Sequence, residues 1–185
     1  VNTVGPVFDI DKLTWLNGHY IRALPAAELA DRITDHLVLS GVLAAQPTPQ
    51  QRELVRLATP LVQERMQLLS EAEGMLAFLF VADDELVVAD DAAASLKPDA
   101  AAVLDASVPA LHALQQGDQW QAAQIEAALR AAVVDGLGVK PKLAFGPLRV
   151  GVTGRRVSPP LFESMEILGA TSTLARLAAL RATLA

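Results

Sequence analysis

The chain has 185 residues, of which 52% are hydrophobic and only 4% aromatic, and its richness in alanine and leucine favours packed helices over sheets. It contains no cysteine, which excludes disulfide bonds and thiolate metal sites and fits a reducing compartment such as the cytoplasm. The longest apolar runs, such as MLAFLFVA, are too short to cross a membrane, and the first residues lack the pattern of a signal peptide.

The net charge of −6 hides an uneven distribution of charge along the chain. Residues 1–137 contain 8 basic and 19 acidic residues, whereas residues 138–185 contain 7 basic and 2 acidic residues. Such an asymmetry indicates a localised anionic partner, with nucleic acid as the leading candidate. Compositional drift in a short C-terminal segment is an equally good explanation of the charges alone.

Two amphipathic helices are predicted near the N-terminus. Residues 9–24 carry apolar side chains at steps of three and four, with Asp9 and Asp11 near the positive end of the helix dipole. Pro25 is suited to the start of a second helix, which has Leu37 on its apolar face. Each segment therefore has one apolar face, as a helix on the surface of a globular domain does.

Two Thr-Pro pairs predict further helix starts. Thr48 is placed as an N-cap, Pro49 at the first helical position, and Gln51 where the partner in a capping box belongs. Thr59 and Pro60 repeat the Thr-Pro pattern. Because proline cannot donate a helical hydrogen bond, Pro60 is expected to separate two helices.

The acidic segment VADDELVVADD interrupts the helical pattern. It lacks the Asp-x-Asp-x-Asp-Gly spacing of a calcium loop, so a solvated turn is expected there. Helices follow at about residues 94–116 and 120–135. The glycines and prolines of GLGVKPKLAFGPLRVGVTG then break the periodicity again.

The segment SPPLFESMEILG has the start and stop signals of a helix. Ser158 is the expected N-cap, Pro159 lies in the first turn, and Gly169 ends the helix. A last helix, capped by Thr171 or Ser172, is expected to run almost to the end of the chain. The sequence therefore predicts an all-α fold of short helices.

Candidate catalytic and metal-binding groups are scarce. His19, His36 and His112 are far apart in the sequence and lack metal-ligand spacing. Ser158 and Ser164 lack the Gly-x-Ser-x-Gly frame of a nucleophile elbow, and GVTGRR does not match the phosphate-binding Walker pattern. We expect this chain to be non-catalytic, with no metal site and no cofactor of its own.

Two long segments carry a family resemblance: FDIDKLTWLNGHYIRAL, at residues 8–24, and PLRVGVTGRRVSPPLFESMEILG, at residues 147–169. The first resembles the motif that follows the catalytic domain of the bacterial glutamyl-tRNA synthetases, which are class I enzymes, and the second resembles a motif near their C-terminus. Between them, LVQERMQLLSEAEGMLAFLF, at residues 61–80, is similar to a family helix with a central arginine. The catalytic H-I-G-H and K-M-S-K-S motifs are absent, and Gly151 stands where the family often has alanine.

The resemblance implies an all-α, multi-helix anticodon-binding region in two packed helical subdomains. Residues 1–25 would be the end of the stem-contact region, and residues 26–88 and 89–185 would be the two anticodon-binding subdomains. The parent enzyme, a glutamate–tRNA ligase, would attach glutamate to tRNA(Glu) in the cytoplasm, with ATP and Mg bound outside this chain. tRNA(Gln) is an open second partner, and neither a membrane nor DNA is implied. The alternative is a helical protein-interaction module that has lost RNA binding.

The resemblance also assigns anticodon contacts, position by position. Arg65 matches the arginine for the third anticodon base, and guanidinium donors fit the two adjacent acceptors of cytosine but not the donors of guanine. Arg149 matches the arginine near the middle base, while Ser158, Pro159 and Leu161 match positions around the first base. From the residues alone, a surface ion pair explains Arg65, and helix capping explains Ser158.

Four more cations are weaker candidates, for contacts with the tRNA backbone. Lys12 lies in the motif at residues 8–24, and Arg155 and Arg156 occupy variable positions of the motif at residues 147–169. Arg130 lies in the helix predicted at residues 120–135. Attraction between such cations and phosphates carries no sequence information. Three more residues of the first motif, Trp15, Asn17 and Tyr20, are expected to be packing and helix-terminus residues rather than ligands.

Overall fold

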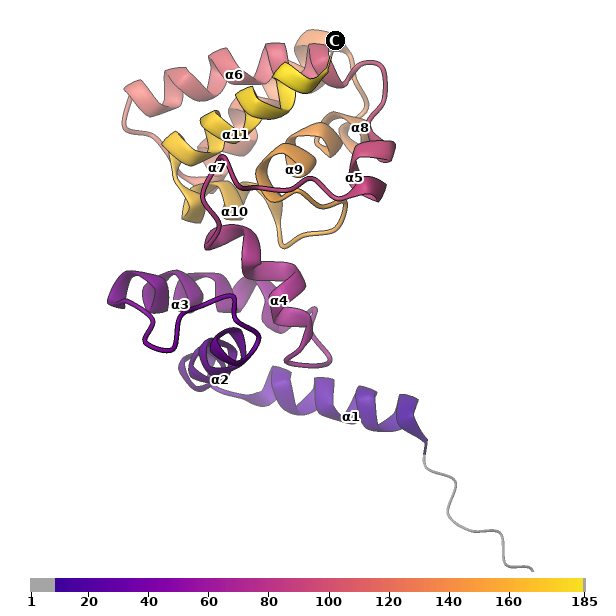
Figure 1. Cartoon of the computed structure of the whole chain (residues 1–185). Helices are drawn as coiled ribbons and strands as arrows, with labels where there is room; N and C mark the ends of the chain where they lie inside the picture. The colour runs from indigo at the N-terminus through magenta and orange to yellow at the C-terminus, as the bar shows by residue number, and fades with distance from the viewer. Residues whose placement is uncertain (1–8, 185) are drawn as a thin grey trace, which may run out of the picture. The chain divides into compact units, whose positions relative to one another are not determined.

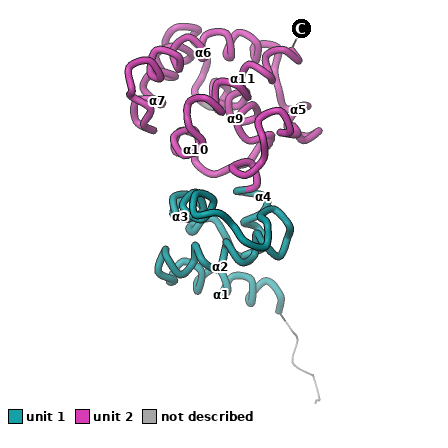
Figure 2. The backbone as a smooth tube through the Cα atoms, turned by 60° about the vertical axis from the view of Figure 1, so that its left-hand side comes forward, with its two compact units in different colours: residues 1–76 teal, residues 77–185 magenta. Residues whose placement is uncertain are grey.

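The structure is a computed structural model that describes residues 9–184, apart from the side chain of Lys142. Within these residues helices are the only regular elements and no strand occurs, which confirms the all-α prediction. Two compact units can be distinguished: unit 1 extends to Leu76 and unit 2 begins at Ala77 (Figure 2). No helix in the described part of the chain is long and apolar enough to cross a membrane.

Unit 1 is built from helices α1 to α4 (Figure 1). Their bounds are α1 Ile10–Ala23, α2 Ala26–Leu39, α3 Pro49–Gln63 and α4 Glu71–Leu76. Helix α2 packs against α3 and α4. The apolar side chains between these helices are fully buried and include Leu29, Ile33, Leu37, Val55 and Val62. The periodic apolar face predicted for the second helix therefore forms the core of this unit.

Helix α1 matches its predicted position, but most of its apolar stripe is exposed. Asp9 caps the helix, since its carboxylate accepts a hydrogen bond from the backbone N–H of Lys12 at 3.0 Å. Ile10 is 68% exposed and Tyr20 is 62% exposed, whereas Ile21 is buried. An amphipathic pattern thus predicted the helix correctly without showing what covers its apolar face.

Helix α3 confirms one Thr-Pro prediction and contradicts the other. The Thr48 hydroxyl accepts a hydrogen bond from the N–H of Gln51, and the Gln51 side chain accepts one from the N–H of Thr48, as in a capping box. Pro60 does not separate two helices, because α3 continues through it to Gln63. Val55 and Thr59 are buried where α3 packs on α2, and this tertiary packing outweighs the one hydrogen bond that Pro60 removes near the helix end.

Unit 2 packs its helices around a second core (Figure 1). The elements are η1 Ala77–Leu79, α5 Asp90–Ser95, α6 Ala100–Gln116, α7 Ala122–Leu129, η2 Arg130–Asp135, α8 Pro141–Ala144, α9 Gly146–Thr153, α10 Leu161–Leu168 and α11 Ala170–Thr183. Helix α11 contacts α6, α9 and α10, and α7 contacts α6 and α10. Fully buried side chains at these contacts include Leu104, Leu111, Ile125, Leu148, Met165 and Leu177.

Several predicted boundaries in unit 2 were wrong. The helix predicted at 94–116 is divided into α5 and α6, because Pro98 disfavours helical backbone at Lys97. The segment predicted to break the helical pattern, residues 136–154, contains α8 and α9, each of which has a proline in its first turn. The acidic segment VADDELVVADD contains no helix up to Ala89, as expected, but its last two residues, Asp90 and Asp91, form the start of α5.

Gly151 allows α9 and α11 to approach closely. A Cβ at this position would lie 2.8 Å from Cδ2 of Leu177 and 3.2 Å from Cδ2 of Leu180, both on α11. Glycine has a low helix propensity, but Gly151 lies inside α9 because only a residue without a side chain allows α11 to pack this closely. Gly169 ends α10 with φ +89°, as predicted. It is also the N-cap of α11, so neither predicted cap, Thr171 or Ser172, is used.

Candidate nucleic-acid interface

The loop between α9 and α10, residues 154–160, contains most of the predicted site. Gly154 ends α9 in a left-handed conformation, with φ +69°, which a residue with a side chain adopts only under strain. Its carbonyl accepts a hydrogen bond from the N–H of Ala89 at 2.9 Å. A Cβ at Gly154 would lie 2.5 Å from the carbonyl oxygen of Val87. The first residue of the loop is therefore fixed against residues 87–89.

Arg149 holds the far end of this loop. It lies on α9 rather than in the loop where the sequence placed it, and its Nη1 donates to the carbonyl oxygen of Pro159 at 3.0 Å and to the hydroxyl of Ser158. The Ser158 hydroxyl in turn lies 2.9 Å from the same Pro159 oxygen. The structure thus brings together three of the residues that the family resemblance assigned to the anticodon site.

Ser158 is not the N-cap of α10, which corrects the sequence prediction. The helix begins at Leu161, two residues later than expected, and Pro160 is its N-cap. Pro159 precedes another proline, and a residue in that position is strongly disfavoured from helical backbone angles. The Ser158 hydroxyl therefore binds Arg149 instead of capping a helix.

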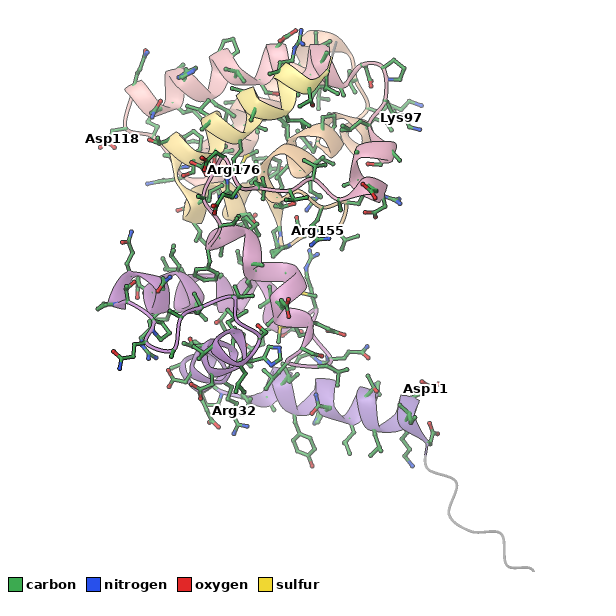
Figure 3. The ribbon with its side chains drawn as sticks, in the orientation of Figure 1. Asp11, Arg32, Lys97, Asp118, Arg155 and Arg176 are labelled. Carbon is green, nitrogen blue, oxygen red and sulfur yellow. The ribbon has the colours of Figure 1, made fainter. Side chains whose placement is uncertain are left out.

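Burial separates the residues that shape this loop from those that a ligand can reach. Ser158 is 5% exposed and Leu161 is 4% exposed, and Pro159 is also buried. Arg155 and Arg156 are exposed, and Figure 3 shows the Arg155 side chain extending out of the loop. The exposed cations can attract phosphates, whereas the buried residues can set the shape of the loop.

Val157 was missed by the sequence predictions. Its side chain is 79% exposed, between two exposed arginines and the buried Ser158. An exposed aliphatic side chain can bury apolar surface against an unstacked base, while the neighbouring cations attract its phosphate. The only sequence indication was one apolar residue inside an otherwise basic and proline-rich loop.

Arg130, a weak candidate, is already engaged within unit 2. It donates to Glu126 at 2.7 Å, and its guanidinium carbon lies 5.6 Å from the centre of the Phe145 ring. That ring packs edge-on against Phe162 of α10, with ring centres 5.2 Å apart. These contacts connect η2 with the start of α9 and with α10, so Arg130 has a structural role in the absence of RNA.

Arg65 lies in unit 1, on an exposed turn directly after α3. The sequence placed it within a helix, but α3 ends at Gln63. The N–H groups of Arg65 and Met66 both donate to the carbonyl of Val62, at 2.9 and 3.0 Å. Met66 is fully buried, so it anchors the turn and leaves Arg65 on the surface.

Residues of α1 hold the turn that carries Arg65. The Gln63 amide donates to the carbonyls of Ile21 and Leu24, at 3.0 and 2.9 Å, and Asn17 donates to the carbonyl of Gln67. A Cβ at Gly18 would lie 3.3 Å from the Cα of Gln67, so this glycine permits the close approach. The first family motif therefore supports the Arg65 turn, a role for Asn17 that the sequence did not reveal.

Replacing Asn17 with alanine is expected to loosen the Arg65 turn without unfolding unit 1. The substitution removes the donor to the Gln67 carbonyl, and one such hydrogen bond contributes about 1 kcal/mol. Hydrogen exchange at the backbone amides of residues 65–67 should accelerate about fivefold. Gln50→Ala, at an exposed position on α3, is the matched control. Unchanged exchange in the Asn17 variant would show that the other α1 contacts suffice.

Lys12 is not brought to this turn. It lies in the first turn of α1 and is exposed, whereas the contacts with the Arg65 turn come from Asn17 and later residues of the helix. Across residues 9–184, no group of three or more His, Asp or Glu side chains is arranged to hold a metal ion.

Known proteins resemble this chain over its whole length. The family profile described as "Anticodon binding domain" matches residues 28–181. A glutamate–tRNA ligase from Kineococcus radiotolerans is 58% identical over 184 residues, which is 100% of this chain and 36% of that protein. A glutamate–tRNA ligase from Cutibacterium acnes is 51% identical over 96% of this chain and 36% of its own length. The chain thus spans about a third of the length of the curated relatives it matches.

A solved structure has the same fold. The crystal structure of a glutamate tRNA ligase from Elizabethkingia meningosepticum matches with a TM-score of 0.79 at 19% identity, over 100% of this chain and 34% of that one. At this identity the match supports the fold, and the family assignment rests on the profile and the sequence relatives. Since the profile covers most of the sequence, the chain belongs to the anticodon binding domain family.

Proposed function

We propose that this chain recognises the anticodon of tRNA(Glu) as part of a glutamate–tRNA ligase. The observation that carries the proposal is the cluster of Arg149, Ser158 and Pro159 beside an exposed basic loop, in a domain whose relatives are glutamate–tRNA ligases. The complete enzyme would attach glutamate to tRNA in the cytoplasm. The ATP and Mg for that reaction would bind outside this chain.

Recognition would take place on unstacked bases of the anticodon loop. RNA sequence is read mainly on single-stranded loops, because the grooves of A-form helices hide the bases. Arg65 would donate to the two adjacent acceptors of a cytosine at the third position. Arg149 would lie near the middle base, and the loop from Ser158 to Leu161 would surround the first base. Arg155 and Arg156 would attract the backbone.

Residues 1–25 would be the end of the stem-contact region. The exposed Ile10, Trp15 and Tyr20 on α1 support this division, because a row of exposed apolar side chains indicates a surface that another part of the protein covers. Residues 26–88 and 89–185 would form the two anticodon-binding subdomains, a division that lies later in the chain than the one between the two compact units, which follows Leu76. tRNA(Gln) would be a second partner only if the third-base contact tolerates guanine.

The proposal can be tested by titrating the chain with the anticodon stem-loop of tRNA(Glu), labelled with a fluorophore. We expect binding roughly five- to 150-fold tighter than to a stem-loop with guanine at the third position, since a base contact contributes about 1–3 kcal/mol. The logarithm of the affinity should fall linearly with that of the salt concentration.

A hairpin of equal length with an unrelated loop is the control for attraction to phosphates alone. Equal binding of all three RNAs, at any salt concentration, would contradict anticodon recognition. No binding to any of them would instead favour the alternative, a helical module that contacts proteins.

A further inference from the structure

Arg176, on α11, is a buried cation that the anticodon assignments do not include. Its side chain is 1% exposed. Nε donates to Oδ1 of Asp83 at 2.6 Å, Nη2 donates to the carbonyl of Val81 at 2.9 Å, and Nη1 donates to the carbonyls of Phe78 and Val152 at 2.9 and 3.1 Å. A buried guanidinium is stable only when its donors are paired in this way.

The acceptors of Arg176 lie in two segments that are distant in the sequence. Phe78, Val81 and Asp83 belong to residues 78–89, which we call the strap, and Figure 3 shows Arg176 where the strap passes α11. Val152 lies in the last turn of α9, where backbone carbonyls lose their helical partners. Arg176 therefore fastens the strap to the end of the helix that carries Arg149.

The other end of the strap touches the start of the candidate loop. Ala89 donates to the carbonyl of Gly154 at 2.9 Å, and Val87 leaves no room for a Cβ at Gly154. The strap is thus fixed on both sides of the point where α9 ends and residues 154–160 begin. One turn earlier, Arg149 holds Ser158 and Pro159 at the end of the same loop.

We propose that Arg176 is a positioning residue for base recognition by unit 2, through its hold on the strap and on the last turn of α9. The inference rests on the proposed function. A site that discriminates bases must be held rigidly before RNA binds. A loop that can change conformation also accommodates the mismatched base, which lowers the difference in affinity between matched and mismatched RNAs. Arginine is required because its donors are spread over the three nitrogens of a rigid planar fork and reach four separated acceptors, whereas the donors of a lysine ammonium all radiate from one nitrogen and cannot span them.

The test compares wild type and Arg176→Lys for binding of stem-loops altered at one anticodon base at a time. In the variant, the ratio of affinities for matched and altered stem-loops should fall by about fivefold to tenfold at the first and middle bases. This is smaller than the largest effect of losing a base contact outright, because the contacts are loosened rather than removed. Discrimination at the third base should stay, because Arg65 belongs to unit 1. The salt dependence should also stay, because no phosphate contact is removed.

Arg181→Lys is the matched control, since Arg181 lies on the same helix and pairs with Asp105 at an exposed site. Asp83→Ala removes one acceptor from the strap at a partly exposed position, and it serves where Arg176→Lys does not fold. It should lower discrimination at the same two bases by a smaller factor.

The outcomes distinguish a failure of the role proposed for Arg176 from a failure of the proposed anticodon recognition. Unchanged discrimination in folded Arg176→Lys and Asp83→Ala proteins, measured well below their melting temperatures, would show that Arg176 only stabilises unit 2. Equal losses at all three bases would also overturn a specific role for α9 and its loop. If wild type itself shows no base preference, the proposed function fails first.

Discussion

Replacing Arg65 with glutamine is expected to abolish discrimination between cytosine and guanine at the third anticodon base. Glutamine has a donor and an acceptor at its amide, so it can pair with either base, whereas the guanidinium only donates. The loss of one bidentate base contact corresponds to about 1–3 kcal/mol, or roughly five- to 150-fold in the affinity ratio. The ratio is measured with stem-loops of tRNA(Glu) that carry cytosine or guanine at this position.

The matched control for Arg65→Gln is Arg56→Gln. Arg56 lies on α3 and forms an exposed ion pair with Glu53, so its replacement changes the net charge of unit 1 equally. This control should weaken binding of both RNAs to a similar small extent, because only long-range attraction changes. An Arg65→Gln protein with the wild-type ratio would refute the assignment of the third base to this turn.

Replacing Gly154 with alanine is expected to cause the largest loss of stability in unit 2. The residue has φ +69°, which costs an alanine about 1–2 kcal/mol. The added Cβ would also lie 2.5 Å from the backbone oxygen of Val87, and a clash with backbone cannot be relieved by a rotamer change. We expect the free energy of unfolding to fall by about 3 kcal/mol or more in urea denaturation.

Gly138→Ala separates the two causes of this loss. Gly138 has nearly the same backbone angle, with φ +67°, but no atom lies within 4 Å of the position of its Cβ. Its replacement should cost only the conformational part, about 1–2 kcal/mol. Similar losses in the two variants would mean that the strap moves away from Gly154 at little cost.

Elements with strong local signals were predicted well from the sequence. Helix α1 begins where its periodicity predicted, with Asp9 of the predicted acidic pair as its cap, and α3 begins with the expected capping box at Thr48. Gly169 ends α10 as predicted. Capping and glycine stops act within one or two turns, so the sequence around them is sufficient to place these boundaries.

Prolines and glycines in packed segments were the main source of wrong boundaries. Pro60 lies inside α3, and Gly151 lies inside α9, because burial against neighbouring helices outweighs the local preference against a helix. The prediction that Pro159 lies in the first turn of a helix was wrong for a local reason that is visible in the sequence. Pro160 follows it, and a residue before proline disfavours helical backbone angles. The Pro159-Pro160 pair moves the start of α10 to Leu161 and leaves Ser158 without a capping role.

The sequence by itself determined the all-α class, the family and the cations from which the candidate site is built. These depend on composition, periodicity and motifs that are continuous along the chain. Only the tertiary structure decided which of those residues are accessible, and that Arg149 holds Ser158 while Asn17 supports the Arg65 turn. The partners of Arg176 lie 24 to 98 residues away in the sequence. Contacts at such separations arise from packing between helices, which no local pattern specifies.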